Sequence, residues 1–414
     1  MRSHPDIGYS SLSYQLEELI VKPLRAVGES LLASVIVLDA LDECKDNDTT
    51  SIVLSALSRH VAELSQLKIL VTSRPEPRIT TVFHSGNLRS VTQRVDLHEL
   101  QLDVVKDDIE RYLTSKLAEI RDYYSDNFES VWPSLDDIRR LADLSFGLFI
   151  FAATSVKFVE DRNYSDPGRQ LALLLHSTVK TIESSSPYRH LDQLYVQVLT
   201  HAFPDISSDF AARLRRVLGS VIHLQDPLPP SALEQLLDLR PTNVRRTLLH
   251  LHSVIIVPDK ENDSQVIRLL HPSFFDFITD PTRCLNPKFV VNAETQHTLM
   301  ARACLRSMKC LKRDTCGINN PGILNSEIHD LPTRIMKHVP PHLQYACRHW
   351  AIHLERGMFS DPLLALVVEF SKHCLLYWLE VCSLLGELRN ALLALNAAKK
   401  SLSVSQTVSI GQIL

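Results

Sequence analysis

The stretch SVIVLDALDE, residues 34–43, decides the fold of the first part of this chain. Val35 to Leu38 form an apolar run that ends in acid, which is the pattern of a parallel strand buried on both faces. The stretch LKILVTSRP, residues 67–75, predicts a second buried strand that Pro75 stops. Because residues 51–65 read as a helix between the two, the order strand, helix, strand predicts an α/β sheet.

Two further segments flank this unit. Residues 12–27 predict an amphipathic helix, and SVTQRVDLHEL, residues 90–100, predicts a third strand near 91–96. The expected sheet is therefore an incomplete parallel sheet of about three strands. It leaves one edge uncovered, and an open strand edge is an aggregation liability.

After residue 100 the pattern becomes helical. Helices are predicted at residues 102–121, 134–160, 166–182 and 189–201, with a loop over 122–134. Ser134 and Asp137 resemble a capping box at the start of the second of these helices.

Residues 207–280 predict a separate small unit. Three helices come first, at 208–222, 231–238 and 242–251, and Ser231 with Glu234 resembles another capping box. SVIIVPD and QVIRLLH then flank the turn-rich KENDS and read as a hairpin. Three helices followed by a hairpin make a winged helix. Residues 291–313, 340–356 and 361–399 are expected to be helical again.

Composition excludes several classes of protein. The formal net charge is −4 and the pI is about 6.5, so no field attracts nucleic acid or an anionic membrane. The eight cysteines form no C-x-x-C pair, and we expect reduced thiols in a cytoplasmic protein. The sequence contains no run of 18 apolar residues, so it predicts no membrane span.

Acidic residues follow the first predicted strand. Asp39 ends that strand, and Asp42 and Glu43 lie on the turn after it. Ligands bind at the carboxyl ends of strands in open α/β sheets. There, one carboxylate can hold magnesium and another can orient an attacking water. The alternative is a solvated acidic turn.

The second strand ends in Thr72-Ser73-Arg74-Pro75. A strand-end arginine can bind a phosphate through two hydrogen bonds, although an arginine before proline is also an ordinary surface residue. The two motifs lie about thirty residues apart in this order, and together they are more specific than either alone.

These motifs resemble those of fungal NACHT proteins, which are signal-transduction NTPases of the STAND class and often carry C-terminal WD repeats. VIVLDALDE resembles the Walker B strand and LKILVTSRPEPRI the sensor strand. The likeness continues in LADLSFGLFIFAATSVKFVED, LDQLYVQVL, LHSVIIVPD, LLHPSFFDFITD and YACRHWAIHL. The resemblance implies that Asp39 is the magnesium-side acid, that Asp42 and Glu43 lie near the attacking water, and that Arg74 senses the γ-phosphate.

The resemblance also assigns His271, at the end of the predicted wing. In this class a winged-helix histidine contacts the β-phosphate of bound ADP, so His271 is expected to face the sheet ends that carry Asp39 and Arg74. The alternative is a histidine that packs before Pro272 and caps the short helix of Phe274 to Ile278.

Two departures from the family pattern limit the activity expected. Gly147-Leu148-Phe149 stands where related ATPases carry Gly-x-Pro, so Phe149 would replace a proline that packs on the base. The phosphate-binding loop requires Gly-Lys followed by Ser or Thr, and none of the 11 glycines is followed by lysine. The chain is therefore expected to be a fragment that lacks this loop.

The resemblance implies four domains. They are a partial NACHT nucleotide-binding domain at 1–100, a helical lid at 101–204, a winged helix at 205–283 and a C-terminal helical domain at 284–414. The expected function is a regulatory module of a nucleotide-switched receptor, for instance in fungal non-self recognition, that does not hydrolyse nucleotide itself. Family cofactors are ATP or ADP with Mg²⁺, and expected partners are proteins or further copies of the chain.

Two alternatives stay open at this point. One is a functional ATP- or GTP-binding STAND NTPase whose phosphate loop is supplied by missing upstream sequence or by another chain. The other is a non-catalytic interaction scaffold in which the polar motifs are relics.

Overall fold

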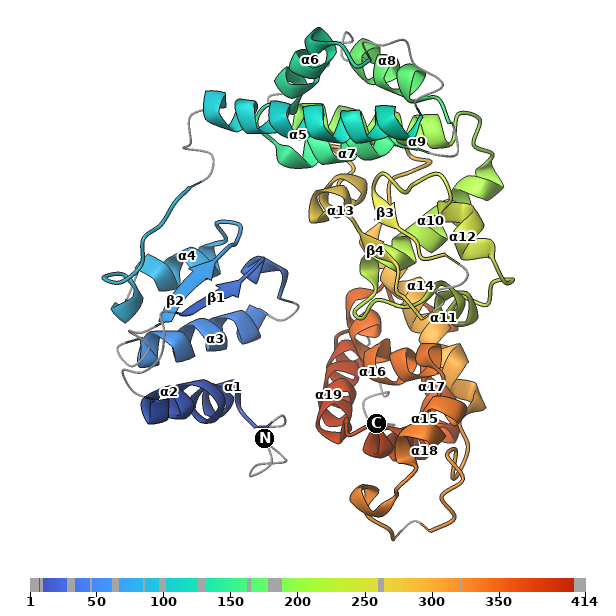
Figure 1. Ribbon diagram of the computed structural model, residues 1–414. Helices are drawn as coiled ribbons and strands as arrows, with labels where there is room; N and C mark the ends of the chain where they lie inside the picture. Colours follow the sequence, from blue (N-terminus) through green and yellow to red (C-terminus); the bar gives the residue numbers. More distant parts are fainter. Residues whose placement is uncertain are drawn as a thin grey trace. The chain divides into compact units, whose positions relative to one another are not determined.

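The computed structural model divides into two compact units, the N-terminal unit Met1–Leu100 and the C-terminal unit Gln101–Leu414 (Figure 1). The structure describes residues 7, 10–27, 34–44, 47–61, 67–84, 86–96, 102–124, 132–161, 165–177, 188–259, 264–320 and 322–405. Each unit is considered separately below.

The N-terminal unit contains a small parallel sheet. Strand β1 (Ser34–Leu38) pairs with β2 (Leu67–Val71) in the register Val35↔Lys68 and Val37↔Leu70. The prediction that these two strands share one parallel sheet is confirmed. Around the sheet lie α1 (Leu12–Leu16), the π-helical segment Glu17–Val21, α2 (Lys22–Val27), α3 (Asn47–His60) and α4 (Pro77–His84).

The prediction of a third strand near residues 91–96 is wrong. Residues 91–96 follow the short turn Gly86–Leu88 without joining the sheet, and residues 97–100 lie outside the described part of the chain. Val91 and Val95 are 61% and 62% exposed. The run between them, Thr92-Gln93-Arg94, offers little apolar area to bury on either face, which removes the main stabilisation of a further strand.

The sheet also differs from the expectation that both of its faces are buried. Val35, Val37 and Leu70 are 63%, 58% and 55% exposed and lie on one face. The residues that alternate with them are half-buried. The core of this unit is small: Leu41, Leu54 and Ile79 are fully buried, and Val71, Val82 and Phe83 pack against them.

The C-terminal unit begins with five helices, as its periodicity predicts, but with one break. They are α5 (Leu102–Tyr123), α6 (Leu135–Ser145), α7 (Phe149–Val159), α8 (Pro167–Ser177) and α9 (Arg189–Ala202). The helix predicted at 134–160 divides into α6 and α7 because Phe146 and Gly147 adopt left-handed backbone angles, with φ of 47° and 75°. The capping box of Ser134 and Asp137 is confirmed.

Three helices and a short hairpin follow. They are α10 (Ser208–His223), α11 (Pro230–Leu236), α12 (Asn243–Leu248), and the antiparallel strands β3 (Ile255–Ile256) and β4 (Arg268–Leu269). This is the element order expected of a winged helix.

The second predicted capping box is wrong. Helix α11 begins at Pro230, so Ser231 is not its N-cap residue. The carboxylate of Glu234 is buried and accepts the backbone N–H of Val244 at 3.0 Å. Glu234 therefore ties α11 to the start of α12 instead of capping its own helix.

The rest of the C-terminal unit is helical. Its helices are α13 (Pro272–Thr279), α14 (Ala293–Ser307), α15 (Leu331–His338), α16 (Pro341–Arg356), α17 (Asp361–His373), α18 (Leu375–Leu384) and α19 (Leu388–Ser405). In the described ranges no single helix is long and apolar enough to cross a membrane. The bent pair α17 and α18, which turns by 73°, meets the length and composition test only when the two are taken together.

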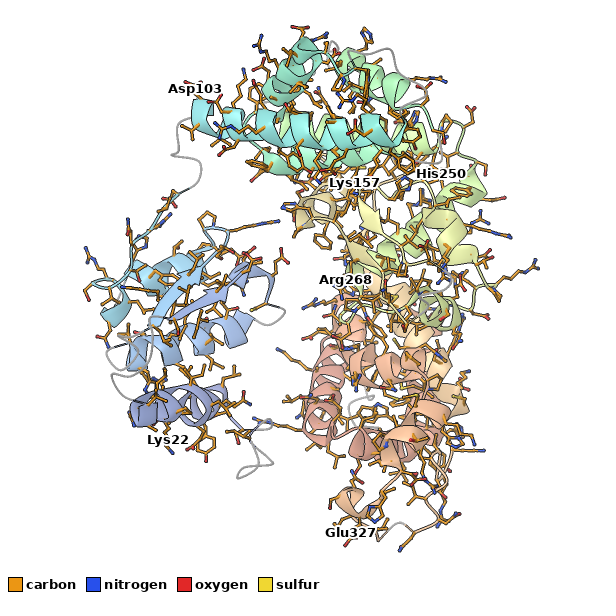
Figure 2. The ribbon with its side chains drawn as sticks, in the orientation of Figure 1. Lys22, Asp103, Lys157, His250, Arg268 and Glu327 are labelled. Carbon is orange, nitrogen blue, oxygen red and sulfur yellow. The ribbon has the colours of Figure 1, made fainter. Side chains whose placement is uncertain are left out.

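One continuous cluster of buried side chains runs from Ile109 in α5 to Leu402 in α19, and side chains fill the space between these helices (Figure 2). Trp350 and Trp378 lie at its C-terminal end with ring centroids 5.8 Å apart. The Trp378 indole donates to the Cys347 carbonyl at 2.9 Å, so its polar group is satisfied although the residue is buried. The division of this unit into three domains stays a prediction.

Candidate functional site

The candidate site lies where β1 and β2 end. The backbone pairing continues past both strands, because the N–H of Thr72 donates to the Leu38 carbonyl and the N–H of Leu41 donates to the Thr72 carbonyl, each at 2.9 Å. Ala40 between them is left-handed, with φ of 51° and ψ of 51°. This turn directs Leu41 into the small core and holds the acidic residues at the sheet end. We call the six side chains there the strand-end cluster: Asp39, Asp42, Glu43, Thr72, Ser73 and Arg74.

Hydrogen bonds cross between the two strand ends within this cluster. The Thr72 hydroxyl donates to the carboxylate of Asp39 and accepts the N–H of Ala40 at 2.9 Å. Asp42 Oδ1 accepts the N–H of Arg74 at 2.9 Å and the hydroxyl of Ser73 at 3.3 Å. The predicted acids and the predicted arginine are therefore brought together, and the carboxylates join the strands.

The cluster carries more negative than positive charge. Arg74 Nε lies 3.6 Å from Asp42 Oδ2, so the single guanidinium of the cluster pairs with one of its three carboxylates. Partial burial raises the pKa of Glu43, the charge of Asp42 raises it further, and Arg74 opposes this shift. Arg78 lies next to the cluster: its Nε contacts Glu76 at 2.6 Å, and its Nη2 donates to the backbone carbonyl of Asp42 at 3.1 Å.

These residues do not by themselves fit a magnesium nucleotide. A polyanion needs several donors and positive charge, whereas the cluster offers one guanidinium that is already paired with Asp42. Among the described residues no group of three or more His, Cys, Asp or Glu side chains could hold a metal ion. No hydrolytic step follows from this geometry.

His271 lies in the C-terminal unit, directly after β4. Its Nδ1 accepts the N–H of Ser273 at 3.1 Å and lies 2.7 Å from the Ser273 hydroxyl. His271 is therefore the N-cap residue of α13, which is the structural alternative that the sequence offers. Because Nδ1 accepts a hydrogen bond, the proton of the neutral ring is on Nε2.

Two residues that the sequence analysis does not identify, Ser273 and Tyr195, hold the His271 ring in place. The hydroxyl of Ser273 lies 2.7 Å from the hydroxyl of Tyr195 in α9. Burial raises the pKa of Tyr195 to about 12, so the phenol keeps its proton. The signal for Ser273 is its place in Leu270-His271-Pro272-Ser273, because an N-cap side chain accepts the backbone N–H of the residue two or three positions on. Nothing local in the sequence points to Tyr195.

The remaining predicted site residues lie at the break between α6 and α7. Gly147 has a φ of 75° and Phe149 is the first residue of α7. The Phe149 ring is 46% exposed and meets Tyr112 edge-on at 6.2 Å. These two residues and His271 belong to the C-terminal unit, whereas the strand-end cluster belongs to the N-terminal unit, so a nucleotide role shared between them stays a prediction.

Comparisons with known proteins bear on the start of the chain. A family model described as Nephrocystin 3, N-terminal matches residues 2–74. The match covers β1, the acidic turn and β2, and it ends at Arg74. This family is not the NACHT domain. No curated protein and no solved structure matches the chain.

Proposed function

We propose that this chain is a regulatory module derived from a NACHT NTPase, part of a nucleotide-switched receptor and not a competent NTPase itself. The pairing of the two strand ends carries the proposal. It brings Asp39, Asp42 and Arg74 to one end of a parallel sheet through bonds between residues more than thirty positions apart. That end is where α/β sheets bind ligands.

The order of elements in the C-terminal unit gives further support. Three helices and a hairpin lead directly to His271, which is the arrangement that the resemblance requires. Ser273 holds Nδ1 of the ring, and the resulting Nε2–H tautomer can donate to an anionic ligand. Ser273 and Tyr195 would act as positioning residues for this histidine.

Charge and donor count support the absence of catalysis in this module. A phosphate loop would supply several charge-assisted hydrogen bonds, each worth about 1.5–3 kcal/mol. Losing three of these hydrogen bonds removes roughly 4 kcal/mol or more of the free energy of nucleotide binding, which weakens a micromolar site to about the millimolar range. The carboxylates of the strand-end cluster repel a polyanion and do not compensate for this loss.

Calorimetry of the whole chain with ADP, and with ATP plus Mg²⁺, tests the proposal. We expect binding no tighter than about millimolar, weakened further by Arg74→Ala. Arg89→Ala is the matched control, because Arg89 is also an exposed arginine of the N-terminal unit but lies outside the cluster. Micromolar binding would contradict the proposal and favour an NTPase with a complete site.

One observation favours a second candidate, the interaction scaffold. The exposed apolar face formed by Val35, Val37 and Leu70 is unusual, because parallel sheets normally have both faces covered. If neither nucleotide produces heat and Arg74→Ala changes nothing, the scaffold is the better description.

A further inference from the structure

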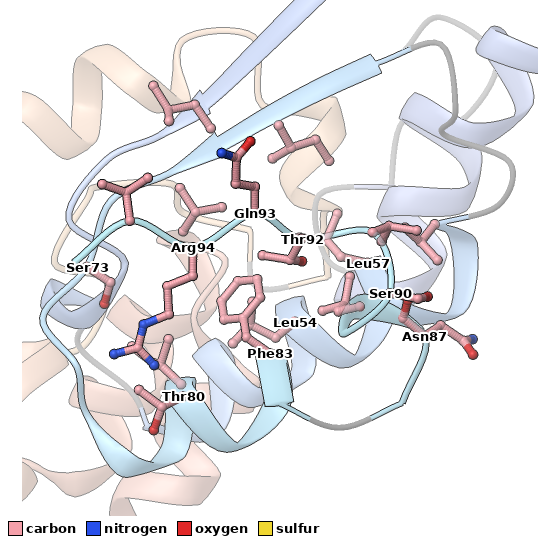
Figure 3. Close-up of a pocket in the computed structure, with 18 of the residues that line it drawn as sticks. Leu54, Leu57, Ser73, Thr80, Phe83, Asn87, Ser90, Thr92, Gln93 and Arg94 are labelled. Atoms are coloured by element: carbon pink, nitrogen blue, oxygen red, sulfur yellow. The ribbon is translucent and has the colours of Figure 1, made fainter.

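The N-terminal unit contains a cavity of about 1210 Å³ that runs along β2 (Figure 3). All five residues of β2 line it, from Leu67 to Val71. Side chains alternate between the two faces of a strand, so a cavity lined by every residue of β2 follows its edge and not one face. We call it the edge cavity.

Its opposite wall is formed by residues 90–96, the segment in which a third strand was expected. Leu54 of α3 and Phe83 of α4 also line it, on the side of the small core (Figure 3). Within the described ranges, strand β2 pairs with β1 in a two-stranded sheet, and residues 90–96 do not join that sheet. Two-stranded sheets are marginally stable in water and commonly gain stability from an added strand.

The volume of the edge cavity is sufficient for one strand. Strands rise about 3.3 Å per residue, neighbours lie about 4.8 Å apart and packed layers about 10 Å apart. A five-residue strand therefore occupies roughly 800 Å³. The cavity is large enough to hold a five-residue strand.

The charges that line the edge cavity indicate what kind of strand it accepts. Four basic residues line it and one acidic residue does: Arg59, Lys68, Arg74 and Arg94 against Asp96. Arg94 contacts Asp96 at 2.8 Å and Arg74 lies 3.6 Å from Asp42, so Arg59 and Lys68 supply the excess positive charge. Leu54, Ile79 and Phe83 give the lining an apolar part. An apolar segment with an acidic residue at one or both ends is complementary to this pattern.

We propose that the edge cavity is a binding slot for a β-strand, and that its occupant is an extended apolar segment of another polypeptide flanked by acidic residues. The segment would hydrogen-bond to the edge of β2 that pairs with no strand in the described part of the chain, and it would separate that edge from residues 90–96. This mode of recognition uses the main chain for affinity and side-chain pockets for specificity. The inference does not depend on the nucleotide proposal.

A labelled peptide tests the slot. The probe is fluorescein-SVIVLD, which copies residues 34–39 and so is an apolar strand that ends in an acid. We expect saturable binding to the full chain in fluorescence anisotropy. The same peptide N-methylated at alternate residues keeps its side chains but loses the N–H groups of one edge, and it should bind at least about tenfold more weakly. Equal binding of the two peptides would overturn the proposal.

Variants with a reversed charge provide a second test of the binding slot. Lys68→Glu and Arg94→Glu should each weaken binding by about three- to tenfold, because both residues line the cavity. Arg89→Glu makes the same charge change at an exposed position that does not line it, and should change binding by less than about twofold. Equal effects of all three would mean non-specific attraction and would overturn the assignment. Circular dichroism checks that each variant is folded.

Two other occupants would also overturn the proposal, each with its own signature. Displacement of the probe by ADP with Mg²⁺ would assign the cavity to a nucleotide. A dimer in sedimentation that the probe dissociates would assign it to a second copy of the chain. A monomer that binds the probe equally well with and without ADP supports the slot.

Discussion

The two units of this protein differ in where their polar side chains lie. In the N-terminal unit, Asp39, Asp42 and Arg74 are tied together at open strand ends, above a core of only a few side chains. In the C-terminal unit, polar side chains are buried in a large continuous core. The first arrangement leaves Asp39 and Arg74 exposed, although the Asp42 side chain is nearly buried, and the second uses polar groups as internal structure.

A chain of hydrogen bonds in the C-terminal unit shows the second arrangement. The N–H of Gln225 donates to the Tyr345 hydroxyl at 3.0 Å, and that oxygen lies 2.7 Å from His353 Nε2. Nδ1 of His353 lies 2.8 Å from Nδ1 of His297. The ring of His353 is therefore hydrogen-bonded at both nitrogens, to Tyr345 on one side and to His297 on the other.

The contrast teaches that burial, not residue type, decides what these polar groups do. Tyr345, His353 and His297 are almost fully buried, so each needs a partner or a neutral state. Such a chain fixes how α14 and α16 pack. At the strand ends Asp39 and Glu43 are exposed, whereas the Asp42 side chain is only 8% exposed and accepts bonds from Ser73 and Arg74.

The largest expected effect is on the core of the C-terminal unit. Phe277 is fully buried and packs on Tyr195 at 5.4 Å, so Phe277→Ala should lower the free energy of unfolding by about 3–5 kcal/mol. Tryptophan fluorescence in a urea titration measures this unit alone, because all three tryptophans lie in it.

Val37→Ala is the matched control in the N-terminal unit. Val37 is 58% exposed, so this change should alter the stability of the N-terminal unit by less than about 0.5 kcal/mol. Hydrogen exchange in peptides that cover residues 34–43 measures it, because this unit contains no tryptophan. A loss similar to that of Phe277→Ala would mean that the exposed sheet face is buried in solution, and the contrast between the units would fail.

The second prediction concerns acid. Burial lowers the pKa of His223 and of His297 to about 4, from 6.5. Between these values the unfolded chain binds more protons than the folded chain, so stability falls as pH decreases. From pH 7.5 to pH 5 each histidine should cost roughly 2 kcal/mol. The urea midpoint, followed by tryptophan fluorescence at both pH values, measures the sum.

His223→Phe sharpens this test. Nε2 of His223 is buried without a hydrogen-bond partner among the described residues, and its ring packs against Phe275 at 5.5 Å. Phenylalanine should keep the packing and remove part of the acid sensitivity. A midpoint that falls between the two pH values as steeply as in the parent chain would mean that His223 is not the buried neutral group described above.

The smallest effect is expected at Glu43, and it has the opposite sign. Burial raises the pKa of Glu43, so its ionised form is disfavoured in the folded state and stability falls as pH rises through that pKa. Glu43→Gln should therefore slow hydrogen exchange modestly at neutral pH in peptides that cover residues 34–43. Asp42→Asn should speed exchange there, because it weakens the bonds to Ser73 and Arg74. Faster exchange in both variants would contradict the account.

The sequence predicts the pairing of β1 and β2 because two apolar runs with polar ends allow few other arrangements. It does not predict that Val35 and Val37 are exposed, since the burial of a strand face depends on which other segments cover it. Similarly, the alternation around Val91 and Val95 predicts a strand, but a local pattern does not establish that residues 91–96 pair with the edge of the sheet.

The same limit applies to the polar sites. The acidic turn and Arg74 can be found because each motif is local and follows a strand. The role of Thr72 is visible only once the strands pair and its hydroxyl meets Asp39. His297 and His353 are 56 positions apart, so their contact depends on how α14 and α16 pack and no spacing rule identifies it.

Phosphate release from ATP with Mg²⁺, measured on the purified full chain, tests the central claim most directly. Because the strand-end cluster carries three carboxylates and a single guanidinium, which pairs with Asp42, we expect no turnover above the protein-free background. Glu43→Gln should then match the parent chain. Turnover clearly above background that Glu43→Gln abolishes would contradict the account, because it would make the strand-end cluster a complete catalytic site.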